Sequence, residues 1–445
     1  MNDLAISEAV ERIASPSWPA FEAQLSSSGG CARPVRLVGK VDVVDSSSGE
    51  LRTRFSTEGE PDGVLLKACG SRRTTRCRPC SQLYKGDARV LVAAGMAGGR
   101  GTDESVTDRP TVFVTLTAPS FGAVHRQADN GPCHPGPQGR CRHGRQLACW
   151  ERHTGADDVV GKPLCPECYD YEAAVIWNAR VTELWRRTMI ATARAMARQS
   201  AMTVRTFAAS YRISFVKVVE YQRRGSIHVH AVLRIDARDG GEVDLDAARL
   251  ADAVHLAAGR VQAPSPLRDG QPIRWGSQLD VGVVSGAERR RVANYLAKYS
   301  TKSADDAGAL DHRITEADIP GLGLPDHLEA LVRTAWRLGG SDALAHLRLR
   351  AWAHCLGFRG HWMTKSRAYS TTFGLLRSAR HEFRKAEALR IAGEEIAVDE
   401  IEVGSWRFAG VGHATEGDAL LARWHAELRA RHRQLARKEE GPWAA

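Results

Sequence analysis

Residues 220–236, EYQRRGSIHVHAVLRID, decide the fold of this chain. From Ile227 onward apolar residues alternate with other types, and His228 and His230 fall on the same side of that alternation. A period of two is typical of a half-buried β-strand, so both imidazoles should share the face that points away from the core. The preceding residues, 213–221, are rich in β-branched and aromatic side chains and predict a second strand. We therefore expect a β-hairpin with two histidines on one face.

The turn of this hairpin sets which residues lie opposite each other. Its sequence, QRRGS, fits a three-residue loop of Arg223, Arg224 and Gly225, with glycine in the left-handed position. That loop places Glu220 opposite His228, with Cβ atoms about 5 Å apart on one face. Two histidines and a carboxylate form a three-ligand set for a divalent cation with open coordination positions. A His-x-His pair on a strand also arises by chance, so a purely structural role stays open.

Residues 285–303, SGAERRRVANYLAKYSTKS, predict a helix with two tyrosines on its polar side. Ser285 followed by Glu288 is a capping box, which marks the start of a helix. At helical spacing, Val292, Ala293, Leu296 and Ala297 form one face, and Tyr295, Lys298, Tyr299 and Lys302 form the opposite one. A solvated amphipathic helix is the alternative, although such a helix has little need of two tyrosines.

These motifs carry a family resemblance. HVH followed by YLAKYSTK resembles the His-hydrophobe-His and tyrosine motifs of HUH endonucleases, in particular of rolling-circle replication initiators, the Rep proteins. VFVTLTAP, at 112–119, resembles the first motif of that family, and the tyrosines follow the histidines as in replication initiators rather than relaxases. The cysteines before YDYEAAVIWNARVTELWRR, and the later GFRGHWMTKSRAYSTTFG, resemble initiators of actinobacterial plasmids and integrative conjugative elements. The resemblance covers about residues 69–383.

The resemblance implies both a fold and a reaction. The fold is α+β, with a central antiparallel sheet like that of HUH endonucleases, flanking helices, an inserted zinc-binding cysteine region and a mainly helical C-terminal part. The reaction is nicking and rejoining of single-stranded origin DNA through a 5′-phosphotyrosine, which starts and ends rolling-circle replication. Mg²⁺ or Mn²⁺ would be the catalytic ion, held by His228, His230 and Glu220.

The resemblance also assigns the nucleophile to the tyrosine helix. Tyr295 and Tyr299 are the candidates, and Lys298 would stabilise the phenolate or a phosphate beside them. Related plasmid initiators have a glutamate at the first of the two tyrosine positions. Because this sequence has tyrosine at both, we expect the two residues to alternate as nucleophiles.

The ten cysteines predict metal binding rather than disulfides. The N-terminal residues do not form a secretory signal, so we expect a cytoplasmic protein with reduced thiols. Cys77-x-x-Cys80 and Cys165-x-x-Cys168 have the spacing of zinc knuckles, and we expect the two pairs to share one structural zinc. Residues between the pairs could complete a second site or replace one pair: Cys133, Cys141, His143, Cys149 and His153. Buried free thiols are the alternative.

Composition and length bound the remaining choices. The chain has 445 residues, 43% of them hydrophobic and 26% charged, with a net charge of +10, which suits a soluble protein of two or three domains and a polyanionic partner. It contains no GxxxxGK[ST] motif, so a host helicase and polymerase would open and copy the DNA. We expect a poorly defined leader at 1–66, a zinc-binding region at 67–170 interleaved with the strand 111–119, an endonuclease core at 171–304, and a basic helical region at 305–445.

DNA contacts are expected from the motifs and from the basic segment 357–370. The residues that we assign to such contacts are Thr115, Thr117, Lys302, Arg359, Lys365 and Arg367. The aromatic stripe of the predicted helix 171–199 is simplest as core. A mobilisation relaxase or an HUH transposase would share the chemistry, whereas a non-catalytic zinc-binding DNA regulator would leave the tyrosines and the histidine pair unexplained.

Overall fold

The chain forms two compact units. The structure, a computed structural model, describes residues 3–46, 48–128, 131–136, 139–267, 270–302, 312–392 and 400–439. One unit comprises Met1–Asp87 together with Phe373–Ala445, and the other comprises Ala88–Thr372. The four segments expected from the sequence differ from this grouping, because the two ends of the chain belong to the same unit.

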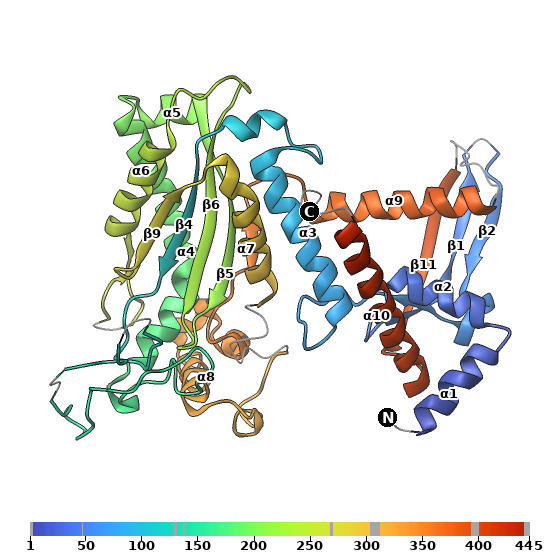
Figure 1. The fold of residues 1–445 in the computed structure, drawn as a ribbon, viewed down its shortest axis with the longest axis horizontal. Coiled ribbons are helices and arrows are strands. Elements are labelled where there is room, and N and C mark those ends of the chain that lie inside the picture. Colours follow the sequence, from blue (N-terminus) through green and yellow to red (C-terminus); the bar gives the residue numbers. More distant parts are fainter. Residues whose placement is uncertain are drawn as a thin grey trace. The chain divides into compact units, whose positions relative to one another are not determined.

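The larger unit is built on a five-stranded sheet with the order β10-β5-β6-β4-β9, in which every neighbouring pair is antiparallel. Figure 1 shows its long strands side by side. The strands are β4 (Thr111–Thr117), β5 (Tyr211–Tyr221), β6 (Ile227–Ala237), β9 (Leu279–Val283) and β10 (Met363–Lys365). A separate two-stranded ribbon pairs β7 (Gln262–Ala263) with β8 (Ile273–Arg274). The predicted antiparallel sheet with flanking helices is confirmed.

The β5–β6 hairpin has the predicted turn and register. Gly225 has a φ of 76°, and the main-chain nitrogen of Gln222 donates to the carbonyl of Ser226 at 2.8 Å. Glu220 consequently lies opposite His228, as predicted. Successive side chains of a strand point to opposite faces, so one face of β6 carries the histidines and the other carries apolar residues.

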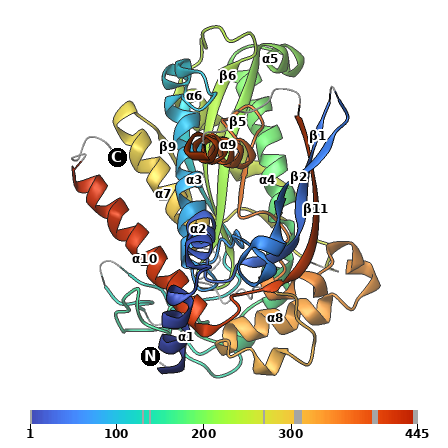
Figure 2. The ribbon, with the colours of Figure 1, turned by 90° about the vertical axis from the view of Figure 1, so that its right-hand side faces the viewer.

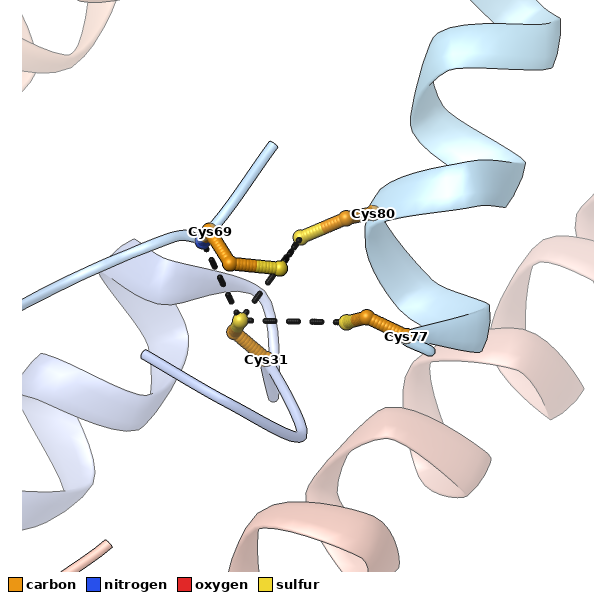
Figure 3. A group of neighbouring side chains, drawn as sticks. All are labelled: Cys31, Cys69, Cys77 and Cys80. Carbon is orange, nitrogen blue, oxygen red and sulfur yellow. Dashed lines mark hydrogen bonds between the residues drawn. The ribbon is translucent and has the colours of Figure 1, made fainter. Parts of the chain in front are cut away.

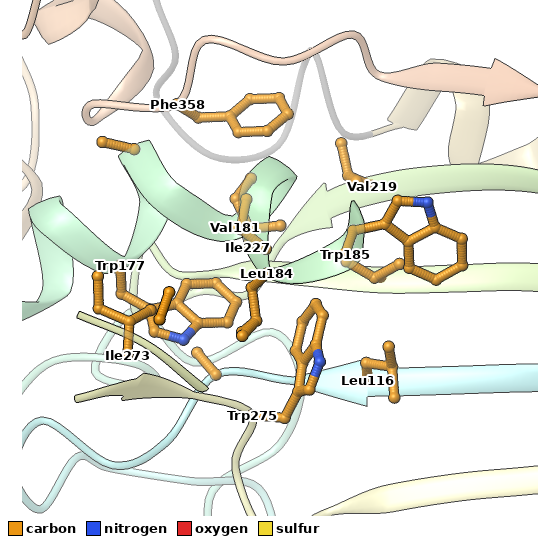
Figure 4. Close-up of a cluster of buried hydrophobic side chains, with 14 of the residues drawn as sticks. Leu116, Trp177, Val181, Leu184, Trp185, Val219, Ile227, Ile273, Trp275 and Phe358 are labelled. Atoms are coloured by element: carbon orange, nitrogen blue, oxygen red, sulfur yellow. The ribbon is translucent and has the colours of Figure 1, made fainter. Parts of the chain in front are cut away.

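The apolar face of the sheet packs on two helices. These are α4 (Tyr171–Gln199), which Asp170 caps by accepting from the main-chain nitrogen of Ala173, and α6 (Ala247–Arg260). Trp177, Leu184 and Trp185 of α4 are buried in this core together with Leu116 and Ile227 (Figure 4). The aromatic stripe is therefore core, as predicted.

The other helices of this unit surround the same sheet. They are α5 (Val204–Ser210), α7 (Arg289–Lys302) and α8 (Asp326–Leu338), and short 3-10 turns follow α8. Helix α7 packs beside β5 on the histidine face. Helix α3 (Arg78–Ala97), which runs across the sequence boundary between the two units, was not predicted.

The smaller unit is a second antiparallel sheet of order β11-β1-β2, with β3 also pairing with β1 (Figure 2). Its strands are β1 (Val35–Asp45), β2 (Leu51–Ser56), β3 (Leu65–Lys67) and β11 (Glu400–Val411). Its helices are α1 (Asp3–Ala14), α2 (Trp18–Ser28), α9 (Phe373–Ala392) and α10 (Glu416–Glu439). The segment expected to be a poorly defined leader thus contains two helices and three strands, and β11 interrupts the region expected to be mainly helical.

None of the described helices combines the length and the apolar character that crossing a bilayer requires.

Lys217 of β5 provides a test of the core. Its side chain is on the apolar face, 5% exposed, with the ammonium 5.4 Å from the centroid of the Trp185 ring. Burial lowers the pKa of Lys217 from 10.5 to about 8. Because the folded pKa lies below that of the unfolded chain, the cost of burying the charge is complete below about pH 8 and disappears as the pH rises through about 10.5.

We predict that Lys217→Met raises the free energy of unfolding at pH 7 by about 2–3 kcal/mol, and that the gain fades towards pH 10.5. Denaturant titrations at several pH values measure it. Lys365→Met, on the neighbouring strand, is the matched control and should lower stability, because the Lys365 ammonium donates to three main-chain carbonyls. A gain that does not depend on pH would contradict the burial argument.

Candidate functional site

Three potential metal ligands meet on the polar face of the central sheet. One ligand atom each from Glu220, His228 and His230 lies within 4.8 Å of the others. The paired strands β5 and β6 position all three, since Glu220 is opposite His228 and Val218 is opposite His230. The arrangement follows directly from the predicted register.

His230 is the centre of this group. It is 2% exposed, and its Nδ1 lies 3.2 Å from the Thr115 hydroxyl on β4. Its Nε2 lies 3.2 Å from the Glu220 carboxylate and 3.4 Å from the Tyr295 hydroxyl. A hydrogen bond at one ring nitrogen fixes the ring so that the other nitrogen can face a ligand.

His228 offers a buried nitrogen without a partner. Its Nδ1 lies 3.3 Å from the Gln222 amide, whereas its Nε2 has no hydrogen-bond partner among the described residues. Burial, aided by His230 and Arg224, lowers the pKa of His228 to about 3, so the ring is neutral near pH 7. A neutral imidazole with an unsatisfied nitrogen suits metal binding, because metals bind the deprotonated ring. Glu220, His228 and His230 therefore fit a divalent cation.

The two tyrosines of α7 lie over His230. The predicted capping box is present, with Ser285 and Glu288 each bonding the main chain of the other. The ring centroids of Tyr295 and Tyr299 lie 5.1 Å and 5.3 Å from that of His230, and 4.5 Å from each other. Burial, with smaller effects from Tyr299 and Glu220, raises the pKa of Tyr295 above its usual value of 10.

Strand β4, which carries the first motif, lies next to the histidines of β6. In β4, Thr115 pairs with His230 and Thr117 pairs with His228. Phe113 was missed by the sequence reasoning, although its alternation with the two threonines places it on their face. Its ring stacks on His230 at 5.9 Å and meets Tyr295 edge-on at 5.6 Å. Phe113 therefore helps to hold the tyrosine over the histidine.

The residues that we predicted to contact DNA differ in whether their side chains already have hydrogen-bond partners within the protein. Thr117 donates its hydroxyl to the carbonyl of Gln278, and Lys365 donates to carbonyls of its own loop. Arg359 donates to the carbonyl of His346. Arg367 is exposed, and the side chain of Lys302 lies outside the described part of the structure. Thr115 and Thr117 thus lie beside the histidines. The side chains of Lys365 and Arg359 already donate hydrogen bonds to main-chain carbonyls.

Nine of the ten cysteines belong to three clusters that the sequence did not resolve correctly. Cys31, Cys69, Cys77 and Cys80 form one cluster (Figure 3), His125, Cys133, Cys149 and His153 a second, and Cys141, His143, Cys165 and Cys168 a third. The expected pairing of Cys77 and Cys80 with Cys165 and Cys168 is wrong, because each pair is completed by residues of its own unit. Cys31, Cys69 and His125 were missed, since none has a cysteine or histidine at knuckle spacing.

The spacing of the thiols fits a tetrahedral ion. In the first cluster the sulfur of Cys31 lies 3.7 Å from those of Cys77 and Cys80, and Cys69 lies 3.7 Å from Cys80. Four sulfurs at ~2.3 Å from a tetrahedral zinc are about 3.8 Å apart, whereas a disulfide is ~2.05 Å long. In the third cluster Cys141 and Cys165 are 3.6 Å apart. These clusters can bind a metal such as zinc.

The ligand atoms of the second cluster lie as close together as those of the other two, but they come from two cysteines and two histidines. The ring nitrogens of His125 and His153 are 3.1 Å apart, and the Cys149 sulfur lies 3.4 Å from His153. The other nitrogen of His153 lies 3.7 Å from the Asp157 carboxylate. A carboxylate behind a metal-binding histidine orients the ring.

Comparisons with known proteins agree with the motifs. Residues 17–427 match the family described as "Replication initiator protein, pSAM2". The chain is 38% identical over 448 residues to a replication initiator protein from Streptomyces ambofaciens, an alignment that covers 96% of this chain and 94% of that protein. No solved structure matches the chain significantly.

We predict that the purified chain carries about three tightly held zinc ions, one for each cluster. Cys31→Ser should lose one equivalent and unfold at a lower temperature, because the free energy of binding a structural zinc is partly free energy of folding. Elemental analysis and thermal unfolding measure both. Cys355→Ser, which changes the cysteine outside the three clusters, is the control and should keep all the zinc. A folded chain that contains no zinc would contradict the prediction.

Proposed function

Because the chain belongs to the replication initiator family that includes the pSAM2 type, we propose that it starts replication by nicking one strand of its origin. The reaction is HUH-type, rolling-circle chemistry, in which a tyrosine is joined to the 5′ phosphate and a 3′-OH is released. The same chemistry in reverse rejoins the strand at the end of the cycle. The free 3′ end primes a host polymerase, and a host helicase opens the duplex.

One observation carries this proposal: two tyrosine side chains lie over a Glu-His-His group on one sheet face. Tyr295 reaches within 3.4 Å of His230, and the ligand atoms of Glu220, His228 and His230 converge. A structural zinc module does not need tyrosines beside an incomplete ligand set, since structural sites are closed by four ligands. An incomplete set beside a nucleophile suits phosphoryl transfer.

The chain's own residues would act as follows. A Mg²⁺ or Mn²⁺ ion held by Glu220, His228 and His230 would polarise the scissile phosphate and offset its developing charge. A tyrosine oxygen forms a bond to phosphorus as the bond from phosphorus to the 3′ oxygen breaks. The phenol gives up its proton in this step and the departing oxygen takes one up, so no net proton is consumed. Lys298, whose ammonium lies 5.5 Å from the Tyr299 ring centroid, would stabilise negative charge on the phenolate or the phosphate.

We infer that both tyrosines take part. They lie four residues apart on α7 and each ring is near His230. One tyrosine can hold the covalent strand while the second attacks the newly made origin, so initiation and termination each have a nucleophile. Their shared environment supports alternation rather than a single nucleophile with a structural neighbour.

Two other functions remain as alternatives. A mobilisation relaxase or an HUH transposase would use the same residues, but the replication initiator family over residues 17–427 favours initiation. A zinc-binding DNA regulator without catalysis would account for the thiol clusters, but it would give no role to the Tyr295–His230 contact.

We predict that His230→Ala reduces nicking by at least about 100-fold, since it removes both a ligand and the partner of Tyr295. Single-stranded oligonucleotides that tile the chain's own replicon, incubated with Mn²⁺, would show cleavage and a covalent adduct on a denaturing gel. His255→Ala, an exposed histidine of α6 on the opposite side of the sheet, is the control and should nick like the parent. If His230→Ala nicks at the parental rate, the HUH mechanism is wrong.

We predict that Tyr295→Phe and Tyr299→Phe each retain part of the nicking activity but lose complete replication cycles. Mass spectrometry of the trapped adduct should find DNA on either residue of the parent, and the double variant should form no adduct. One inactive single variant beside a fully active one would mean that a single nucleophile suffices. The zinc content of each variant, unchanged from the parent, serves as the folding control.

A further inference from the structure

A cavity lies next to the histidines, beyond the turn of the β5–β6 hairpin. It measures about 470 Å³, within the size range of small-molecule sites. Its wall includes Thr117, which pairs with His228, and Gln222, whose amide contacts the His228 ring. The cavity therefore adjoins the candidate metal ligands, and its described lining residues include none of those ligands and neither tyrosine.

The chemistry of the lining points to an anionic ligand that forms hydrogen bonds. The lining residues include Arg126, Arg223 and Arg224, and among the described residues of the lining there is neither aspartate nor glutamate. The Arg224 guanidinium donates to the carbonyls of Ala118 and Pro119 at 2.8 Å and to the Gln222 side chain at 2.9 Å. Arg126 donates to the carbonyl of Cys133 at 2.8 Å. These acceptors are neutral, so they orient the guanidinium groups without cancelling their charge.

The same wall offers a surface for a base. Pro119, Val124 and Val160 supply apolar contact, and the side chains of Gln222, Ser277 and Gln278 supply donors and acceptors. Gly276 lies so close to β4 that an added Cβ would come within 2.6 Å of the Ala118 carbonyl. The arginines could therefore bind a phosphate, the apolar residues the face of a base, and the polar side chains its hydrogen-bonding edge, which together are the parts of a nucleotide.

We propose that this cavity binds one nucleotide of the substrate strand, next to the phosphodiester that is cut. The inference rests on the proposed function, because the strand must cross the histidine group to place its neighbouring nucleotide there. The cavity would thereby set which sequence is nicked, since a nucleotide held through its base edge is selected by that edge.

The chain between β4 and α4, which contains the second and third clusters, contributes residues to one side of this cavity. His125 and His134 line it, and both are within the segment that folds around the His125–Cys133–Cys149–His153 cluster. Arg223 on the opposite side donates to the carbonyls of Gly155 and Asp157 of the same segment. This segment and the hairpin turn are thus fastened together around the cavity.

The test measures binding separately from cleavage. Fluorescence anisotropy of fluorescein-labelled dT20 with the full chain, in buffer without added Mg²⁺ or Mn²⁺, reports strand affinity. Ser277 is exposed on the cavity wall, so Ser277→Trp should fill the cavity and weaken dT20 binding about tenfold. Ser341→Trp is the matched control, because Ser341 is exposed elsewhere in the same unit and makes no side-chain cap bond. It should bind dT20 like the parent.

A second variant guards against misfolding of the first. Arg126→Ala should weaken dT20 binding about fivefold and make it less sensitive to salt, while Arg249→Ala on α6 should change neither. Unchanged affinities in Ser277→Trp and Arg126→Ala, with a parent that binds dT20, would overturn the cavity assignment and leave the proposed function intact. A parent that binds neither dT20 nor any of the oligonucleotides that tile its replicon would overturn both. Binding of free dTMP that Ser277→Trp abolishes, without any change in dT20 affinity, would assign the cavity to a free nucleotide and also overturn the inference.

Discussion

The site depends on the buried polar groups at the β5–β6 turn. Asn178 of α4, 0% exposed, donates to the carbonyls of Gly225 and Leu356 and accepts from the main-chain nitrogen of Ile227, at 2.9–3.0 Å. His327 of α8 lies 3.1 Å from the carbonyl of Arg224. A buried donor or acceptor left without a partner costs about 1–3 kcal/mol. These contacts therefore hold the turn in one register, and a slip by one residue would turn both His228 and His230 into the core.

Donor chemistry separates the two kinds of candidate metal site in this chain. The three clusters each present four soft or borderline ligands, which close the coordination of a tetrahedral ion and leave no position for a substrate. The Glu220–His228–His230 group presents three ligands and a single carboxylate charge. A divalent ion there would keep a net positive charge and open positions, which is what attraction of a phosphodiester requires. The four-ligand clusters are therefore suited to a structural role, and the three-ligand group is suited to a catalytic one.

Local signals made the histidine face of the sheet predictable. Alternation in β6, the loop containing Gly225 and the capping box at Ser285 each act over a few residues, and the structure has all three. The cysteine and histidine clusters could be predicted only in part. A CxxC pair identifies two ligands in the sequence, whereas the other two come from distant residues that the fold brings close. Cys31 follows α2 and Cys69 follows β3, and the fold brings both to Cys77 and Cys80. Likewise, β1 pairs with β11 across more than 350 residues of chain. No local turn or residue spacing in the sequence could therefore predict the sheet of the smaller unit.

The protonation of Tyr295 links this geometry to control of the proposed reaction. Its hydroxyl faces His230 in partly buried surroundings that raise its pKa, and Glu220 beside it further disfavours a phenolate. The folded chain without DNA thus keeps Tyr295 as a neutral phenol, which is a weak nucleophile. In the proposed reaction, positive charge beside Glu220 would make the phenolate of Tyr295 less costly. Phe113, packed edge-on against Tyr295, keeps the phenol in place meanwhile. In the proposed reaction, the surroundings that disfavour the phenolate of Tyr295 would therefore also hold its ring in place for a bound strand.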